Sequence, residues 1–211
     1  MHIPDGFLTA QVYLPAAGLS AAGLAWGLKR TEKLDEKRIP LLGAMGAFIF
    51  AAQMVNFPVA PGVSGHLLGG ALAALSLGPA AAGVIMTAVL LIQAFFMHDG
   101  GITALGANVL NMAILAPWVA YFTYQAVTRV LPGRFGNTIG IFFASWLSVL
   151  LAALAAALEL GWSGMFALNV ILTTMALWHI LIGIGEGILT TLALNYLVQL
   201  KPADIAGEAK E

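Results

Sequence analysis

This sequence has no cysteine and few charged residues. Of its 211 residues none is cysteine, and 9% are charged; typical soluble domains carry roughly 25%. The lack of cysteine excludes disulfides, thiolate metal sites and cysteine-based catalysis. The net charge of −1 gives no general attraction to nucleic acid. There is also no glycine-rich Lys-Ser/Thr phosphate loop, so we do not expect this chain to hydrolyse nucleotide itself.

Hydrophobic residues are abundant instead, at 60% of the chain. That leaves too little polar surface to cover a water-soluble globule, so we expect a lipid bilayer to be the solvent. A spanning helix needs about 20 apolar residues. Seven segments satisfy or approach this requirement, at 12–28, 39–57, 67–79, 80–97, 103–128, 138–160 and 166–199. The sequence therefore predicts an all-α, polytopic membrane bundle of about seven transmembrane helices, in a single domain over residues 1–211.

The basic residues predict an orientation for this bundle. They are Lys29, Arg30, Lys33, Lys37 and Arg38 between the first two segments, Arg129 and Arg134 between the fifth and sixth, and Lys201 and Lys210 after the last. Basic loops stay in the cytoplasm. Seven spans then place the N-terminus outside and the C-terminus in the cytoplasm. The start lacks the basic region of a signal peptide, so we expect Met1 to be retained.

The first residues form a potential metal chelator. The Met1 amine, the His2 backbone amide and the His2 imidazole can turn toward one point and offer three nitrogens in fused chelate rings. A fourth nitrogen would complete a square, a geometry that suits divalent nickel or copper. His66, in an expected outer loop, is the natural candidate, and Ser64 is a possible hydrogen-bond partner for its second ring nitrogen. The alternative is that a histidine at the second position is accidental.

Other polar residues near or within the expected spans allow two interpretations each. His98 in an outer turn is either a further ligand or a solvated loop residue. Asn108 and Asn111 share one helix face, where they either join helices by hydrogen bonds or line a cavity. His179 and Glu186, on one stripe of the last helix, either make interhelical contacts or serve an autonomous, ion-coupled divalent-cation carrier.

These motifs together resemble the CbiM/NikM family, the substrate-binding (S) components of energy-coupling-factor (ECF) transporters for cobalt and nickel. The start Met-His-Ile-Pro-Asp-Gly-Phe-Leu, the block Ser-Gly-His-Leu-Leu-Gly at 64–69, and Leu-Gly-Ala-Asn at 105–108 are similar to family motifs, and the resemblance covers essentially the whole chain. It implies a near-planar nitrogen site made by Met1, His2 and His66, with the N-terminus folded into the helical bundle. Where members often have Thr, this chain has Val63.

The resemblance also implies partners and a setting. The partners would be a membrane scaffold (T) subunit, two ATPase subunits and, in some systems, a small auxiliary membrane subunit. The chain would be a multi-pass protein of a prokaryotic plasma membrane, with no enzymatic activity and no resident cofactor. Its substrate would be Co²⁺ or Ni²⁺, and imported cobalt would feed cobalamin biosynthesis. Because ligands must lose protons, we expect affinity to rise with pH through the imidazole range.

Overall fold

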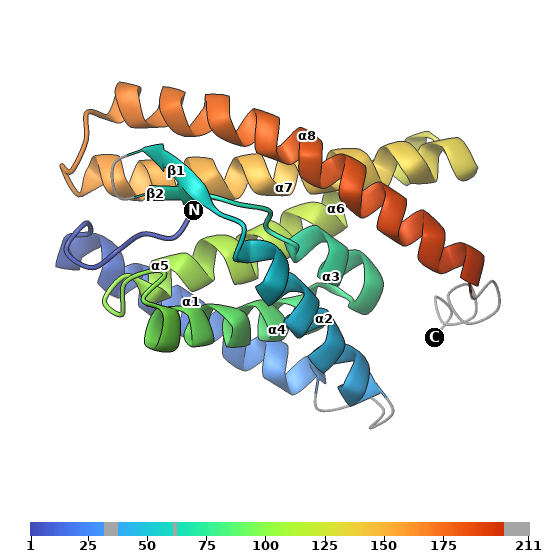
Figure 1. Ribbon diagram of the computed structural model, residues 1–211, viewed down its shortest axis with the longest axis horizontal. Coiled ribbons are helices and arrows are strands. Elements are labelled where there is room, and N and C mark those ends of the chain that lie inside the picture. The colour runs from blue at the N-terminus through green and yellow to red at the C-terminus, as the bar shows by residue number, and fades with distance from the viewer. Residues whose placement is uncertain (32–37, 61–62, 201–211) are drawn as a thin grey trace.

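The computed structural model describes residues 1–31, 38–60 and 63–200, and most of these are helical (Figure 1). Lys33, Lys37, Lys201 and Lys210, which entered the prediction of orientation, lie outside the described residues. The elements are α1 (Ala10–Thr31), α2 (Ile39–Gln53), β1 (Phe57–Ala60), β2 (Val63–Gly65), α3 (Gly70–Leu77), α4 (Pro79–Ile92), the π-helical turn η2 (Gln93–Met97), α5 (Leu105–Val109), the π-helical turn η3 (Leu110–Leu115), α6 (Ala116–Val130), α7 (Arg134–Trp162) and α8 (Leu168–Leu200).

Four stretches of helix are long and apolar enough to cross a membrane. They are Pro79–Met97, Leu105–Val130, Arg134–Trp162 and Leu168–Leu197. α2 is a shorter apolar helix of 15 residues. The prediction of an all-α membrane bundle is therefore confirmed, while the count of seven spans and the orientation stay predictions.

The expected segment 67–79 forms the short interior helix α3. Its eight residues rise about 12 Å at 1.5 Å per residue, well short of a hydrocarbon core of about 30 Å. Gly69 caps the start of this helix with a φ of 77°, and a Cβ there would lie 2.8 Å from Ile49. Gly78 and Pro79 then turn the chain directly into α4. α3 therefore serves as packing inside the bundle.

The two longest helices, α7 and α8, run side by side (Figure 1). Small residues recur every four positions on the buried face of α7, at Ala144, Ser148, Ala152 and Ala156. This spacing lets helices approach closely in lipid, where packing and not the hydrophobic effect joins them. The described part of the chain thus ends in a regular helical pair, against which the more irregular N-terminal half packs.

The expected outer loop before His66 forms an antiparallel hairpin of β1 and β2. Phe57 pairs with Gly65 and Pro58 with Ser64. These strands were not predicted from the sequence. The N-terminus lies beside this hairpin, in the interior of the fold (Figure 1). The hairpin and the N-terminal segment together carry the residues of the candidate site.

Candidate metal-binding site

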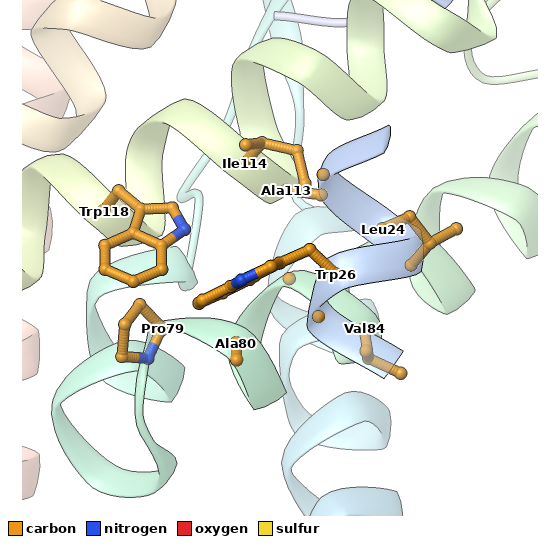
Figure 2. Close-up of a pocket in the computed structure, with 11 residues that line it drawn as sticks. Leu24, Trp26, Pro79, Ala80, Val84, Ala113, Ile114 and Trp118 are labelled. Atoms are coloured by element: carbon orange, nitrogen blue, oxygen red, sulfur yellow. The ribbon is translucent and has the colours of Figure 1, made fainter. Parts of the chain in front are cut away.

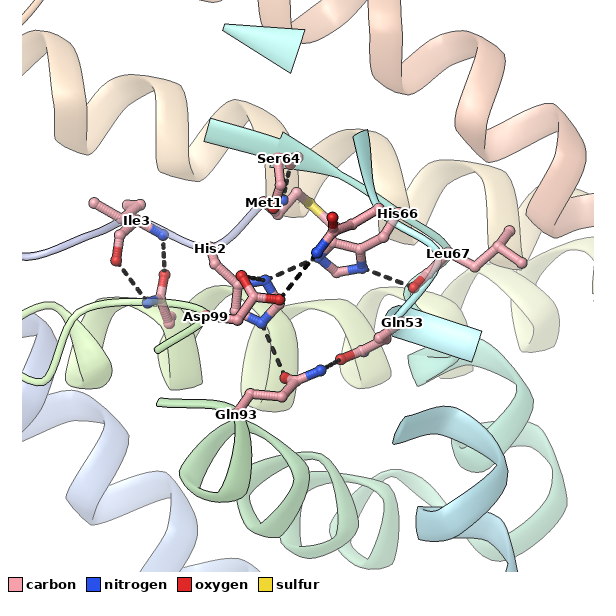
Figure 3. Close-up of polar contacts among 11 residues, drawn as sticks. Met1, His2, Ile3, Gln53, Ser64, His66, Leu67, Gln93 and Asp99 are labelled. Carbon is pink, nitrogen blue, oxygen red and sulfur yellow. Dashed lines mark hydrogen bonds and ion pairs between the residues drawn. The ribbon is translucent and has the colours of Figure 1, made fainter. Parts of the chain in front are cut away.

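Met1, His2 and His66 meet in the interior (Figure 3). His2 Nδ1 and His66 Nε2 lie 3.1 Å apart, and the two rings stack with centroids 4.7 Å apart. The Met1 amine donates a hydrogen bond to the Ser64 carbonyl on β2. All three residues are buried, with exposed fractions of 1%, 3% and 1%. Two nitrogens bound at right angles, each about 2.0 Å from a metal, would lie about 2.8 Å apart, so the ring nitrogens are close to a binding separation.

Hydrogen bonds to the backbone of Ile3 and to the side chain of Asp5 hold the N-terminal segment in this position. Asn108 accepts a hydrogen bond from the Ile3 nitrogen at 2.9 Å and donates one to the Ile3 carbonyl at 3.0 Å, and the Gly101 nitrogen donates to the same carbonyl. The Asp5 carboxylate accepts hydrogen bonds from Thr103, which lower the pKa of Asp5. A Cβ on Gly101 would lie 2.2 Å from the Asp5 nitrogen, so this close approach requires glycine.

The neighbours of His66 determine which ring nitrogen carries its proton. His66 Nδ1 lies 2.8 Å from the carbonyl oxygen of Leu67, and a carbonyl can only accept. Nδ1 is therefore the protonated nitrogen, and Nε2 carries the lone pair that faces His2. The Ser64 hydroxyl, suggested above as the partner of His66, is buried and has no hydrogen-bond partner among the described residues, and a backbone carbonyl takes that role.

A chain of two glutamines determines which ring nitrogen of His2 carries its proton. Leu68 contributes a carbonyl that accepts from Gln53 Nε2 at 2.7 Å, Gln53 Oε1 accepts from Gln93 Nε2 at 2.9 Å, and Gln93 Oε1 lies 3.0 Å from His2 Nε2. Each oxygen in this chain can only accept, so the nitrogen that faces it must donate. Gln93 Oε1 therefore faces a protonated His2 Nε2. His2 Nδ1 is left with its lone pair. Figure 3 shows this chain below the two histidines.

The site consequently gathers acceptors that face one another. His2 Nδ1 and His66 Nε2 both present lone pairs, and Asp99 Oδ1 lies 3.4 Å from His2 Nδ1. Burial lowers the pKa of the Met1 amine to about 5 and that of His2 to about 4, and burial lowers the pKa of His66 well below its usual range. Burial thus favours the neutral forms of the amine and of both imidazoles. A bound cation would relieve the repulsion between their lone pairs.

Of the remaining predicted residues, His98 lies apart from this cluster of nitrogens, whereas His179 and Glu186 lie beside it. His98 is exposed, with a φ of 54° at the end of η2. His179 is buried, its Nδ1 lies 2.8 Å from the Met175 carbonyl, and its Nε2 has no hydrogen-bond partner in the described part of the chain. Glu186 accepts two backbone hydrogen bonds, from Leu68 and Gly69.

Asn111, the second asparagine on the shared helix face, has a role different from that of Asn108. Its side chain donates to Glu159 at 2.7 Å, which joins η3 to α7. This is the helix–helix contact that the sequence allowed. Asn108 instead holds the N-terminal segment through Ile3.

Three residues of the site were not predicted from the sequence. Gln53, Gln93 and Asp99 contact the histidines directly or through one another. The two glutamines interrupt apolar runs, and polar groups at membrane depth face the bundle interior or a cavity. That signal was available for both. Among the described residues no three His, Asp or Glu side chains form a metal cluster, so any chelate here depends on backbone nitrogen.

Two hollows lined mainly by apolar residues differ from this site. One lies between α1, α4 and the start of α6, where Trp26 and Trp118 face each other with ring centroids 5.4 Å apart (Figure 2). None of its lining residues is charged or carries a metal-ligating side chain. The other lies between the hairpin and α8, and its lining includes His66, Phe57 and Trp178. The nitrogen cluster therefore borders an apolar wall on the α8 side.

Comparisons with known proteins point to a single family. The family model described as "CbiM: Cobalt uptake substrate-specific transmembrane region" matches residues 2–203. A protein of Archaeoglobus fulgidus, named as a putative fused nickel transport protein, is 42% identical over 99% of this chain and 69% of its own length. The cobalt transport protein CbiM of Acetoanaerobium sticklandii is 32% identical over 94% of this chain and 85% of its own. A crystal structure of a transition metal transporter is 33% identical with a TM-score of 0.90, covering 97% of this chain and 96% of that one.

Proposed function

The chain belongs to the CbiM family of cobalt-uptake transmembrane proteins, and we propose that it captures Co²⁺ or Ni²⁺ for uptake across the plasma membrane of a prokaryote. The observation that carries this proposal is the meeting of the Met1 amine with the facing lone pairs of His2 and His66. The ion would bind to the Met1 amine, the deprotonated His2 amide, His2 Nδ1 and His66 Nε2. It would reach this near-planar set of nitrogens from the outer face.

Two considerations bear on the choice of metal. A square field of four nitrogens suits nickel on coordination grounds. The relatives are named for nickel and for cobalt transport alike. We therefore propose one site able to hold either ion, with the physiological substrate decided by the tighter binding and by supply. Cobalt taken up in this way would serve cobalamin biosynthesis.

Energy for uptake would come from other chains. The sequence has no phosphate loop, so we propose the ECF arrangement, with a membrane scaffold subunit, two ATPase subunits and, where present, a small auxiliary membrane subunit. Capture then occurs in this chain and ATP hydrolysis in its partners. We also propose seven passes with the N-terminus outside, in which the short helix α3 and the chain before it together make the third pass. This orientation places the proposed site on the side from which the ion arrives.

A second candidate is an autonomous ion-coupled carrier that uses His179 and Glu186. The observation in its favour is the Nε2 of the buried His179, which lacks a partner among the described residues. The contacts of Glu186 favour the first proposal, because both carboxylate oxygens are engaged by backbone N–H groups beside the site. Metal uptake into vesicles separates the two candidates: the carrier transports without ATPase partners, and the capture subunit requires them.

The experiment that tests capture is calorimetric titration of Ni²⁺ and Co²⁺ into the purified protein. The native N-terminus is compared with a version that carries one extra N-terminal residue, which converts the Met1 amine into an amide. Tight binding that is lost on extension is the expected result. Equal binding by the two versions would contradict a chelate that includes the Met1 amine.

A further inference from the structure

Glu186 on α8 contacts the chain immediately after His66. The Leu68 nitrogen donates to one carboxylate oxygen, and the Gly69 nitrogen donates to the other at 2.7 Å. Glu186 is 2% exposed. A buried carboxylate is costly unless it is well hydrogen-bonded, and here two successive backbone donors satisfy it. One side chain of the C-terminal half thus accepts hydrogen bonds from two neighbouring peptide groups of the N-terminal half.

The orientation of these two peptide groups also fixes the direction of their carbonyls, which orient the histidines. In a planar trans peptide the N–H and the C=O point in opposite directions. The peptide that ends in the Leu68 N–H begins with the Leu67 carbonyl, which accepts from His66 Nδ1. The peptide that ends in the Gly69 N–H begins with the Leu68 carbonyl, which accepts from Gln53 at the start of the glutamine chain.

We propose that Glu186 is a positioning residue for metal capture, which holds both peptide planes so that the lone pairs of His66 and His2 face the bound ion. This inference rests on the proposed function. Glu186 acts through the peptides and does not touch the metal. Loss of its carboxylate frees the planes to rotate, and the hydrogen bonds that select the two tautomers then weaken together.

Glu159 provides a matched control. It is also a buried carboxylate of a long apolar helix, 7% exposed, and it accepts a hydrogen bond from Asn111 at 2.7 Å. Within the described residues, the side chain of Glu159 hydrogen-bonds to Asn111 and to none of Met1, His2 and His66. A general cost of removing a buried carboxylate from this bundle would appear in both variants. An effect on the site itself would appear for Glu186 alone.

The test is titration of Ni²⁺ into the full-length native protein, the N-terminally extended protein, Glu186→Gln and Glu159→Gln, with the absorption spectrum of bound nickel recorded. Loss of a partner that orients a metal ligand typically costs about 10- to 100-fold in affinity, and we expect this loss for Glu186→Gln. We expect native affinity for Glu159→Gln. The nickel absorption of Glu186→Gln should shift to longer wavelength, toward that of His66→Ala, because a nitrogen donor is weakened.

The His66→Ala background distinguishes positioning from a general loss of structure. There the loss caused by Glu186→Gln should become several-fold smaller, because the part of its effect that passes through His66 is already absent and only the part through His2 remains. Glu186→Asp, which keeps the charge but shortens the side chain, is a second variant and should show the same spectral shift. This variant tests the positioning role if Glu186→Gln fails to fold.

Two results would overturn the positioning role while leaving capture intact. One is tight binding by the native protein, lost on extension, with unchanged affinity in both Glu186 variants. The other is an equal loss from Glu186→Gln in the native and His66→Ala backgrounds. If the native and extended proteins bind nickel equally, the proposed function itself fails and the inference falls with it.

Discussion

The two halves of the chain satisfy many of their polar groups in different ways. In α6–α8 the hydroxyls of Thr128, Ser145 and Thr173 each donate to the carbonyl four residues earlier in the same helix. In the N-terminal half the Met1 amine donates to Ser64, 63 positions away, and the Ile3 nitrogen to Asn108, 105 positions away. Groups satisfied within one helix need no other element, whereas groups satisfied across the fold assemble a site.

Glu186 is one of the residues through which the two halves meet. It belongs to the regular C-terminal half, but its carboxylate is engaged by the backbone beside His66. We therefore expect substitutions in the N-terminal half to affect metal binding, and substitutions in the C-terminal half to affect stability, with Glu186 as the exception.

The largest loss of Ni²⁺ affinity should come from His66→Ala, in the N-terminal half. The variant removes the fourth nitrogen, so Ni²⁺ affinity should fall by more than the roughly 100-fold upper figure for losses outside the ligand set. His98→Ala is the matched control, because His98 is exposed, and its affinity should equal that of the native protein. Calorimetric titration measures both. A loss from His98→Ala as large as that from His66→Ala would contradict the assigned ligand.

Asn108→Leu and Asn111→Leu form the next pair. Asn108 holds the Ile3 backbone by two hydrogen bonds, so its loss should loosen the Met1–His2 chelate and lower Ni²⁺ affinity about 10- to 100-fold. Asn111 contacts Glu159, so its loss should lower thermal stability with little change in affinity. Titration and thermal unfolding in detergent measure the two effects. An equal loss of affinity in the two variants would remove the distinction between a residue that holds the N-terminal segment and one that contacts α7.

Gln93→Met should have a smaller effect, near the lower figure of about 10-fold. Methionine has a similar length, but its thioether is a weak acceptor, so the His2 ring loses the partner that selects its tautomer. The bound nickel should keep its four nitrogens, and its absorption should shift to longer wavelength by less than in Glu186→Gln, because only the His2 donor is weakened. Titration with the absorption spectrum recorded measures both properties. A shift as large as that of Glu186→Gln would show that Gln93 does more than orient His2.

A change of one pH unit between pH 6 and pH 8 should have the smallest effect, at most about tenfold in affinity. Protons compete with the metal, so affinity falls as pH falls. The pKa of the Met1 amine is lowered to about 5 and that of His2 to about 4, so competition at these groups is felt mainly below pH 5. Above that range the His2 amide still releases one proton per bound ion. Titration at several pH values measures the slope, and flat affinity between pH 6 and pH 8 would contradict a deprotonated amide ligand.

The structure changes the origin of the pH dependence that the sequence predicted. An ordinary imidazole titrates near neutral pH, which led us to expect a rise in affinity through that range. Burial beside the amine lowers the pKa of both His2 and His66. Burial is a property of the fold, so this difference was beyond the reach of residue spacing.

Much of the helical fold was predictable, because long apolar runs report directly on membrane helices. The expected segments 80–97, 103–128, 138–160 and 166–199 agree closely with the four long helices of the structure. The hairpin of β1 and β2 was missed, since two short strands within one loop leave little periodic signal. The expected segment 67–79 produced a helix of eight residues, because Gly69 and Gly78 bound it.

The amino-acid sequence by itself determined the membrane character of the chain and the ring sizes that a Met1–His2 chelate would have, because composition and covalent adjacency do not depend on folding. Only the tertiary structure decided which nitrogen faces that chelate, which proton each histidine carries, and what Glu186 contacts. His66 meets His2 across 64 positions, and Glu186 meets Leu68 across 118. Contacts of that separation depend on how the helices pack, and spacing along the chain carries no record of them.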